Sequence, residues 1–147
     1  MEFAKKGGMI DVTTGGGCYM GTAADAVKMA LENGVPLDRI TMSSDGHGSM
    51  PRFNEQGEMV GLATGKIDCD FEAVQDLARV YGLETALRPM TTNIARALGL
   101  PGKGAVAAGY DADLLFLNKD MQITDVFMKG DACMRGGVVV KKGAFEE

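Results

Sequence analysis

The feature that most constrains the fold is a helical segment enclosed by two short strands near the start of the chain. Residues 9–13 and 39–43 are rich in β-branched and apolar side chains, which is typical of strands. Between them, residues 22–33 carry apolar side chains at helical spacing, with Thr22 as a start signal and Gly34 as a stop signal. A strand, a helix and a strand in this order favour parallel pairing with a right-handed crossover, so the predicted fold class is α/β.

Downstream of this unit, the pattern predicts a hairpin and further helices. Residues 52–60 are expected to form a hairpin that turns at residues 54–57. An amphipathic helix is predicted over residues 70–81, capped by one of the aspartates at its start. A shorter helix is predicted to begin with a threonine cap at residue 91 or 92 and to end at Leu98.

The character of the sequence changes at Pro101. From there onward, glycine turns separate short segments that favour strands, and they predict a small antiparallel β unit. We therefore expect two parts, residues 1–100 and residues 101–147. The strands expected in the second part are residues 113–117, 123–128 and 138–142.

Charge and composition exclude several classes of partner. The 147 residues carry 15 basic and 20 acidic side chains, a net charge of −5, which argues against a nucleic acid or an anionic membrane as partner. No apolar run approaches the ~20 residues of a membrane span, and the first residues lack the apolar stretch of a signal peptide. Cys18, Cys69 and Cys133 form no disulfide framework, so we expect a cytoplasmic protein with buried or half-buried free cysteines.

The segment from Ser43 to Ser49 directly follows the second strand and is the most informative stretch for function. In α/β barrels, the carboxyl ends of the strands are where active sites are built. Asp45 at this place could bind a divalent metal ion or accept a proton. Gly46 lets the backbone pass close to a ligand, and Ser49 can donate a hydrogen bond to one. The alternative is a plain turn in which Asp45 caps a helix or closes an Asx-turn.

The other candidate groups carry less information. His47 is the only histidine, and it either orients a substrate or Asp45 or is simply a polar loop residue. A catalytic zinc site takes three protein ligands, so one histidine cannot build one alone. The glycine run at residues 14–17 lacks the lysine of a phosphate loop and is interpreted as a connection.

Three blocks, at residues 2–13, 35–49 and 86–91, together with residues 102–104 and 109–115 beyond the third, resemble isoaspartyl dipeptidases of the amidohydrolase superfamily. The run Gly109-Tyr-Asp-Ala-Asp-Leu resembles the superfamily in general. The Ser-Ser-Asp-Gly-His-Gly-Ser block that ends at Ser49 resembles the dipeptidases more narrowly. The resemblance covers nearly the whole chain in the same order.

The resemblance implies the C-terminal part of a (β/α)8 TIM-type barrel, with strands seven and eight and their flanking helices, followed by a small β-sandwich segment. Such enzymes hold two zinc ions at the mouth of the barrel. Asp45 matches the strand-eight aspartate that touches one metal and acts as general base towards the bridging hydroxide. Ser49 matches a serine that holds the α-carboxylate of a β-aspartyl dipeptide, and Gly46 and His47 lie in the same substrate loop.

The resemblance also implies that this chain starts after strand six, so the histidine and lysine ligands and the substrate-binding arginines would lie upstream. We therefore expect the isolated chain to be inactive and to need the upstream part of the same enzyme. We also expect a homo-oligomer. Two alternatives remain open at this stage. One is another amidohydrolase, dihydroorotase-like or D-aminoacylase-like, and the other is a non-catalytic fragment or subunit that binds a partner chain.

Overall fold

The computed structural model describes residues 1–15 and 21–143 of the chain. Its internal contacts divide the chain into two compact units, Met1–Gly99 and Leu100–Glu147. Each unit has its own fold and is described by itself.

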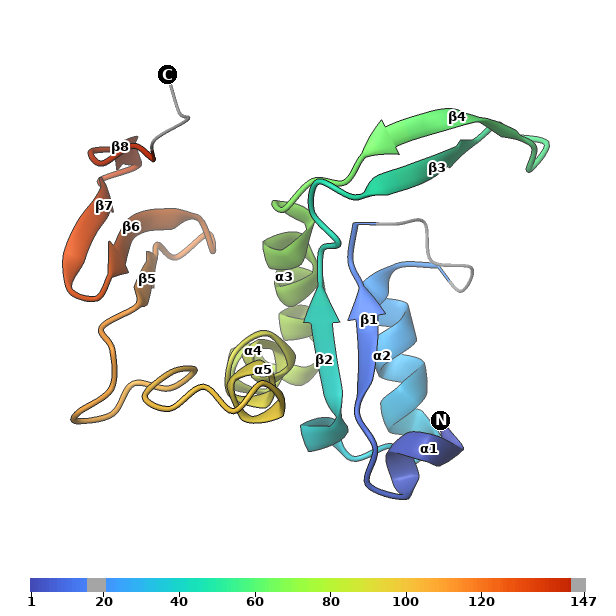
Figure 1. Ribbon diagram of the computed structural model, residues 1–147, viewed down its shortest axis with the longest axis horizontal. Coiled ribbons are helices and arrows are strands. Elements are labelled where there is room, and N and C mark those ends of the chain that lie inside the picture. Colours follow the sequence, from blue (N-terminus) through green and yellow to red (C-terminus); the bar gives the residue numbers. More distant parts are fainter. Residues whose placement is uncertain (16–20, 144–147) are drawn as a thin grey trace. The chain divides into compact units, whose positions relative to one another are not determined.

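The first unit is built on the predicted strand-helix-strand motif. The strands β1 (Ile10–Thr13) and β2 (Ile40–Ser43) pair in parallel, and α2 (Ala23–Glu32) connects them. The register runs from Ile10 opposite Ile40 to Thr13 opposite Ser43. Figure 1 shows the two strands side by side with both arrows pointing the same way. The mixed α/β architecture is therefore confirmed, although these two parallel strands do not close a barrel.

The start of α2 is fixed by a capping box that the sequence indicates in part. The Thr22 hydroxyl accepts a hydrogen bond from the Asp25 amide at 3.2 Å, and the Thr22 amide donates to the Asp25 carboxylate at 2.8 Å. The backbone hydrogen bond from Thr22 also lowers the pKa of Asp25. The predicted role of Thr22 as the helix cap is confirmed.

One face of the β1–β2 pair forms the core of the first unit. Ile40 and Met42 are fully buried, and they belong to a cluster with Val27 of α2 and Leu77 of α3 (Cys69–Tyr81). Because side chains alternate along a strand, the intervening residues of β1 and β2 lie on the opposite face. The helices thus cover one face of the strand pair and leave the other to polar side chains.

The remaining elements of the first unit follow the predicted order with shifted boundaries. The hairpin begins at Ser49, three residues earlier than predicted, and Pro89 lies inside a 3₁₀ turn. Thr91 precedes the last helix but does not cap it, because its hydroxyl donates back to the Leu87 carbonyl at 2.8 Å. The further elements are α1 (Glu2–Lys5), η1 (Leu37–Arg39), β3 (Ser49–Phe53), β4 (Met59–Thr64), α4 (Leu83–Leu87), η2 (Arg88–Met90) and α5 (Thr92–Ala97).

The hairpin β3–β4 extends from the carboxyl end of β2 (Figure 1). Its turn is closed by Asn54, whose side-chain oxygen accepts hydrogen bonds from the amides of Gln56 and Glu58. Phe53 and Leu62 are each about 60% exposed, so the hairpin buries little apolar surface within the described residues.

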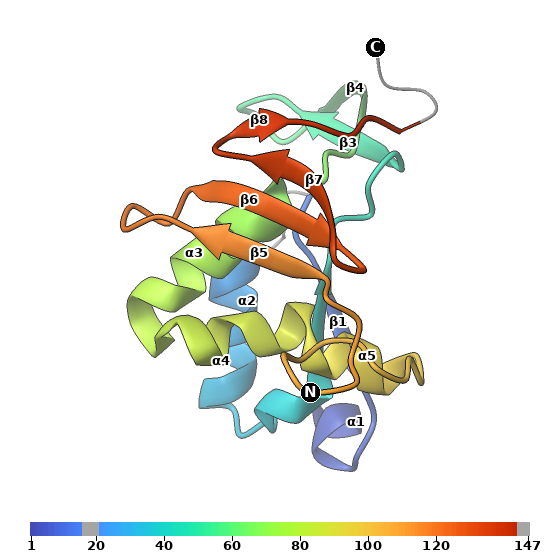
Figure 2. The same ribbon diagram turned by 90° about the vertical axis from the view of Figure 1, so that its left-hand side faces the viewer.

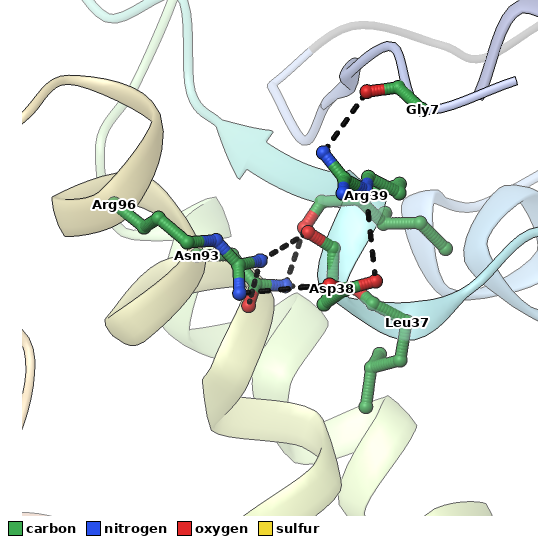
Figure 3. Close-up of polar contacts among 7 residues, drawn as sticks. Gly7, Leu37, Asp38, Arg39, Asn93 and Arg96 are labelled. Carbon is green, nitrogen blue, oxygen red and sulfur yellow. Dashed lines mark hydrogen bonds and ion pairs between the residues drawn. The ribbon is translucent and has the colours of Figure 1, made fainter.

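The amino-terminal end of β2 is held by a polar cluster that Figure 3 shows in detail. The side-chain amide of Asn93, in α5, is buried and donates to the carbonyls of Leu37 and Ile40, both at 2.8 Å. Arg96 donates to the Asp38 carbonyl, and Arg39 reaches the Gly7 carbonyl at 2.9 Å. We name these contacts the Asn93 cluster; it ties α5 and the segment before β1 to the start of β2.

The second unit contains one four-stranded antiparallel sheet among its described residues (Figure 2). The strand β7 was not predicted, and β8 is shorter than the expected strand at residues 138–142. The ring of Phe127 packs edge-on against Phe116, with centroids 5.6 Å apart, and the Arg135 guanidinium lies 4.5 Å above it. The strands, in sheet order, are β5 (Leu114–Leu117), β6 (Ile123–Met128), β7 (Asp131–Arg135) and β8 (Val138–Val139).

An ion pair closes the loop that leads into this sheet. The Lys103 ammonium lies 2.7 Å from the Asp111 carboxylate and also binds Asp113, which accepts a further hydrogen bond from the Lys129 amide. The hydrogen bond from Lys103 is the main reason that the pKa of Asp113 lies below its usual value of 3.8. The aspartates of the Gly-Tyr-Asp-Ala-Asp-Leu run therefore have a structural function.

The cysteines and the lengths of the helices can be compared with the sequence analysis within the described residues. Cys69 and Cys133 are free and half-buried, as predicted, whereas Cys18 lies outside the described residues. Every helix within residues 1–15 and 21–143 is too short or too polar to serve as a membrane span.

We expect Asn93→Ala to destabilise the first unit. It removes two hydrogen bonds from a buried site and leaves the Leu37 and Ile40 carbonyls unsatisfied, which costs roughly 1–3 kcal/mol. Urea unfolding of wild type and variant would measure the loss, with Asn118→Ala in an exposed turn as the matched control. A midpoint for Asn93→Ala that equals the control would contradict this role.

We expect Lys103→Met to lower the melting temperature of the second unit at neutral pH. Because the folded pKa of Asp113 is depressed, its stabilising effect is present above the pKa of the unfolded chain. That effect is lost as the pH falls through the folded value, so the difference from wild type should shrink towards about pH 2. Thermal unfolding across this range, with the exposed Lys119→Met as control, provides the measurement. A difference that does not change with pH would argue against the ion pair.

Candidate functional site

Asp45 lies just beyond the carboxyl end of β2, two residues after Ser43. At this end the chain also leaves β1, and the Thr14 amide donates to the Ser43 carbonyl at 2.8 Å. The Asp45 residue is exposed, and its carboxylate has no hydrogen bond or ion pair with any of the described residues. A free carboxylate thus stands at the shared carboxyl end of two parallel strands.

The turn around Asp45 has an unusual backbone. Asp45 and His47 have positive φ angles of 50° and 63°, a conformation that non-glycine residues rarely adopt. The side-chain-to-backbone bond of this turn comes from Ser44, whose hydroxyl accepts from the Gly46 amide at 3.2 Å. Ser44 therefore closes the turn that was the alternative role for Asp45, and the Asp45 carboxylate remains available.

Two glycines allow other parts of the chain to approach Asp45 closely. A Cβ atom at Gly65 would lie 2.7 Å from the Asp45 carbonyl oxygen, and one at Gly48 would lie 2.8 Å from the same atom. Such contacts with backbone cannot be relieved by turning a side chain. The position of Asp45 thus depends on the absence of side chains at Gly48 and Gly65, which join it to the base of the hairpin.

The other predicted site residues surround the same turn. The amide of Gly46 is bound by Ser44, and the amide of His47 donates to the Gly65 carbonyl at 3.0 Å. These two amides are therefore already satisfied within the chain. The His47 side chain is exposed, and exposed Ser49 begins β3 opposite Thr64. The side chains of Asp45, His47 and Ser49 are exposed, so all three can contact a ligand.

The polar face of the strand pair carries a cluster that the sequence analysis missed. The Asp11 carboxylate of β1 accepts hydrogen bonds from the hydroxyls of Thr41 at 2.6 Å and of Ser43 at 2.5 Å, both in β2. A signal was present in the sequence, because Asp11 interrupts an otherwise apolar and β-branched strand at a position where aspartate is unfavourable.

A further polar contact joins the end of β1 to the start of α3. The Thr14 hydroxyl donates to the Asp70 carboxylate at 2.5 Å and lies 3.3 Å from the sulfur of Cys69. A cavity of about 340 Å³ lies nearby, between the hairpin and α3, and its lining includes Arg52 and Lys66 but not Asp45. This cavity is separate from the candidate site, and the Thr14 contacts are structural.

The described residues can supply part of a metal site. Within residues 1–15 and 21–143, no group of three or more histidine, cysteine, aspartate or glutamate side chains is placed to hold a metal ion. Asp45 fits the role of one ligand, because its carboxylate is exposed and has no partner among the described residues, and oxygen donors suit divalent cations. A complete centre would need donors beyond these residues.

Comparison with known proteins gives the context for this arrangement. The family model described as the amidohydrolase family matches residues 9–133. A β-aspartyl dipeptidase from Fervidobacterium islandicum AW-1, solved with β-Asp-Leu, is 38% identical, with a TM-score of 0.82 over 99% of this chain. An adenine deaminase from Listeria welshimeri is 44% identical over 63 residues, which are 43% of this chain and 10% of the deaminase.

More distant structures share the fold alone. An N-acetylglucosamine-6-phosphate deacetylase from Thermotoga maritima is 19% identical, with a TM-score of 0.64 over 87% of this chain and 39% of its own. The chain spans only 38% of the length of the dipeptidase that it matches almost completely. Because the family model covers residues 9–133, well over half of its residues, the chain belongs to the amidohydrolase family.

Proposed function

We propose that this chain is the C-terminal part of a zinc-dependent β-aspartyl dipeptidase, which hydrolyses β-aspartyl amide bonds. The observation that carries the proposal is the match to the Fervidobacterium dipeptidase over 99% of the chain, at 38% identity. In this proposal, β1 and β2 are strands seven and eight of a (β/α)8 barrel. Residues 101–147 contribute a segment of a small β-sandwich, whose other strands lie elsewhere in the enzyme.

Asp45 is the proposed general base. Its unpaired carboxylate follows a parallel strand at the carboxyl end, which is where barrel enzymes place catalytic groups. It takes a proton from the attacking water as the water oxygen bonds to the amide carbon. When the carbon–nitrogen bond breaks, Asp45 returns that proton to the leaving amine, so aspartate and a free amino acid result.

Asp45 would also be one ligand of the zinc centre. Bound zinc would polarise the amide carbonyl and acidify the water. A carboxylate beside such cations stays ionised until it receives the proton, which suits both functions of Asp45. In this proposal the other ligands come from the upstream part of the same enzyme, since within residues 1–15 and 21–143 Asp45 belongs to no group of three possible metal ligands.

The hydroxyl of Ser49 is the proposed partner for the α-carboxylate of the dipeptide. Ser49 is exposed, and its side chain makes no hydrogen bond within the described residues. The exposed imidazole of His47 and the close backbone at Gly46 would complete this side of the substrate loop. Because the amides of Gly46 and His47 are already bonded, recognition here would rely on side chains.

A second candidate is a different reaction of the same family. Adenine deaminases from several bacteria match 56 to 75 residues of this chain at 40–44% identity, so deamination is a specific rival. Dihydroorotase-like and D-aminoacylase-like hydrolysis are further family alternatives. The remaining alternative is a non-catalytic subunit that binds a partner chain.

The decisive test compares wild type and Asp45→Asn in the full-length enzyme that carries this chain. We expect wild type with zinc to hydrolyse β-Asp-Leu, and the variant to lose roughly 10²–10⁴-fold in kcat because asparagine cannot accept the proton. Hydrolysis of β-Asp-Leu and the zinc content of each enzyme would be measured together. This distinguishes a variant that has lost its metal from one that has lost only its general base. The exposed Asp120→Asn is the matched control and should keep full activity.

The same assay separates the alternatives. Wild type that is inactive on β-Asp-Leu but acts on adenine, dihydroorotate or an N-acyl-D-amino acid would replace the dipeptidase with that family member. Residues 1–147 alone should bind no catalytic zinc and hydrolyse none of these substrates. An active, zinc-loaded 147-residue chain would contradict the proposed division of the active site.

A further inference from the structure

Asp11 occupies a position that strand formation alone does not explain. Aspartate is among the residues least favoured within strands, and Asp11 lies inside β1, opposite Thr41. The backbone pairing from Ile10 opposite Ile40 to Thr13 opposite Ser43 already sets the register without it. A β-branched residue at position 11 would serve strand pairing better, so the carboxylate requires another reason.

The contacts of Asp11 indicate that reason. One carboxylate oxygen accepts the Thr41 hydroxyl at 2.6 Å, and the other accepts the Ser43 hydroxyl at 2.5 Å. The Thr41 hydroxyl is also 3.4 Å from the Ile10 carbonyl, but the shorter contact with a charged acceptor takes its proton. Asp11 has no ion pair with any described residue, so these two hydroxyls are its partners.

The two hydroxyls are thereby oriented. Each hydroxyl directs its single proton to the Asp11 carboxylate, so its oxygen lone pairs point away from Asp11. Ser43 is the last residue of β2 and stands two residues before Asp45. Its carbonyl also accepts the Thr14 amide, so both its side chain and its backbone are bonded to the segment that contains β1.

We propose that Asp11 is a positioning residue, which fixes the carboxyl end of β2 through the Thr41 and Ser43 hydroxyls and so aligns Asp45. This inference rests on the proposed hydrolase function of Asp45. Asp11 itself need not touch the substrate. It binds the side chain of Ser43, the last residue of β2, while Gly48 and Gly65 admit close contacts with the backbone of Asp45.

The test uses the full-length enzyme with β-Asp-Leu as substrate. We expect Asp11→Asn to lower kcat by about 10- to 100-fold, the usual effect of losing a group that orients a metal-site residue, with a smaller change in KM. Thr41→Val should show a loss in the same direction. Thr41→Ser retains the hydroxyl and should therefore keep most of the wild-type kcat. The double variant Asp11→Asn with Ser43→Ala should lose less kcat than the product of the two single fold losses, because both substitutions remove the same hydrogen bond.

The matched control is Asp25→Asn in the capping box of α2. Asp25 also accepts a threonine hydroxyl, that of Thr22 at 2.9 Å, but it lies at the start of a helix. This control should lower the melting temperature and leave kcat unchanged, whereas Asp11→Asn should lower kcat in fully folded, zinc-loaded enzyme.

Three outcomes would overturn the inference. Active wild type together with an Asp11→Asn variant that keeps kcat within about twofold would remove the positioning role and leave the proposed function intact. Equal losses for Thr41→Ser and Thr41→Val would show that the hydroxyl is not what matters. Wild type that is inactive on β-Asp-Leu would overturn the proposed function, and this inference with it.

Discussion

The burial of one face of the β1–β2 pair is the constraint on which the rest of the first unit depends. Ile40 and Met42 are fully buried in a cluster formed largely by helical residues, and burying such side chains contributes about 1.5–3 kcal/mol each. Because a strand alternates its side chains, this burial dictates that Asp11, Thr41 and Ser43 share the opposite face. A slip of one residue would bury the Asp11 carboxylate among apolar side chains, which is costly for an ionised group. The hydrophobic core therefore determines where the polar cluster lies.

The sequence predicted the helical and strand segments well where they depend on contacts between residues close together in the chain. The Thr22 cap, the amphipathic stripe of α3 and the turn at Asn54 are each set by neighbours within a few residues, and all three were predictable. Thr91 shows the opposite case. It looks like a cap in the sequence, but its hydroxyl bonds to the preceding turn, because η2 continues the helical path into α5. The strand β7 was missed because Asp131–Arg135 contains no β-branched residue, although it pairs with β6 across a short turn, with Met128 opposite Asp131.

The candidate site was predictable in position but not in its supporting contacts. That Asp45 follows a strand could be predicted from the order of the elements, because parallel strands bring their carboxyl ends together. That Ser44, and not Asp45, closes the turn could not, since either side chain can bond a nearby amide. The link from Asp11 to Ser43 joins residues 32 positions apart, and only the register of two strands reveals it. The roles of Asp45, Gly46, His47 and Ser49 remain predictions.

The location of the Asn93 cluster has a consequence for how such a protein can diversify. Its buried hydrogen bonds hold the amino-terminal end of β2, while the turn with Asp45 lies beyond the carboxyl end of the same strand. Mutations that reshape the turn leave the contacts of Asn93 untouched, and distant sites contribute to stability almost additively. Substitutions that change the reaction can thus accumulate at the carboxyl end of β2 while the contacts at its amino-terminal end keep the fold stable. This separation offers one physical reason why relatives with different substrates share the architecture.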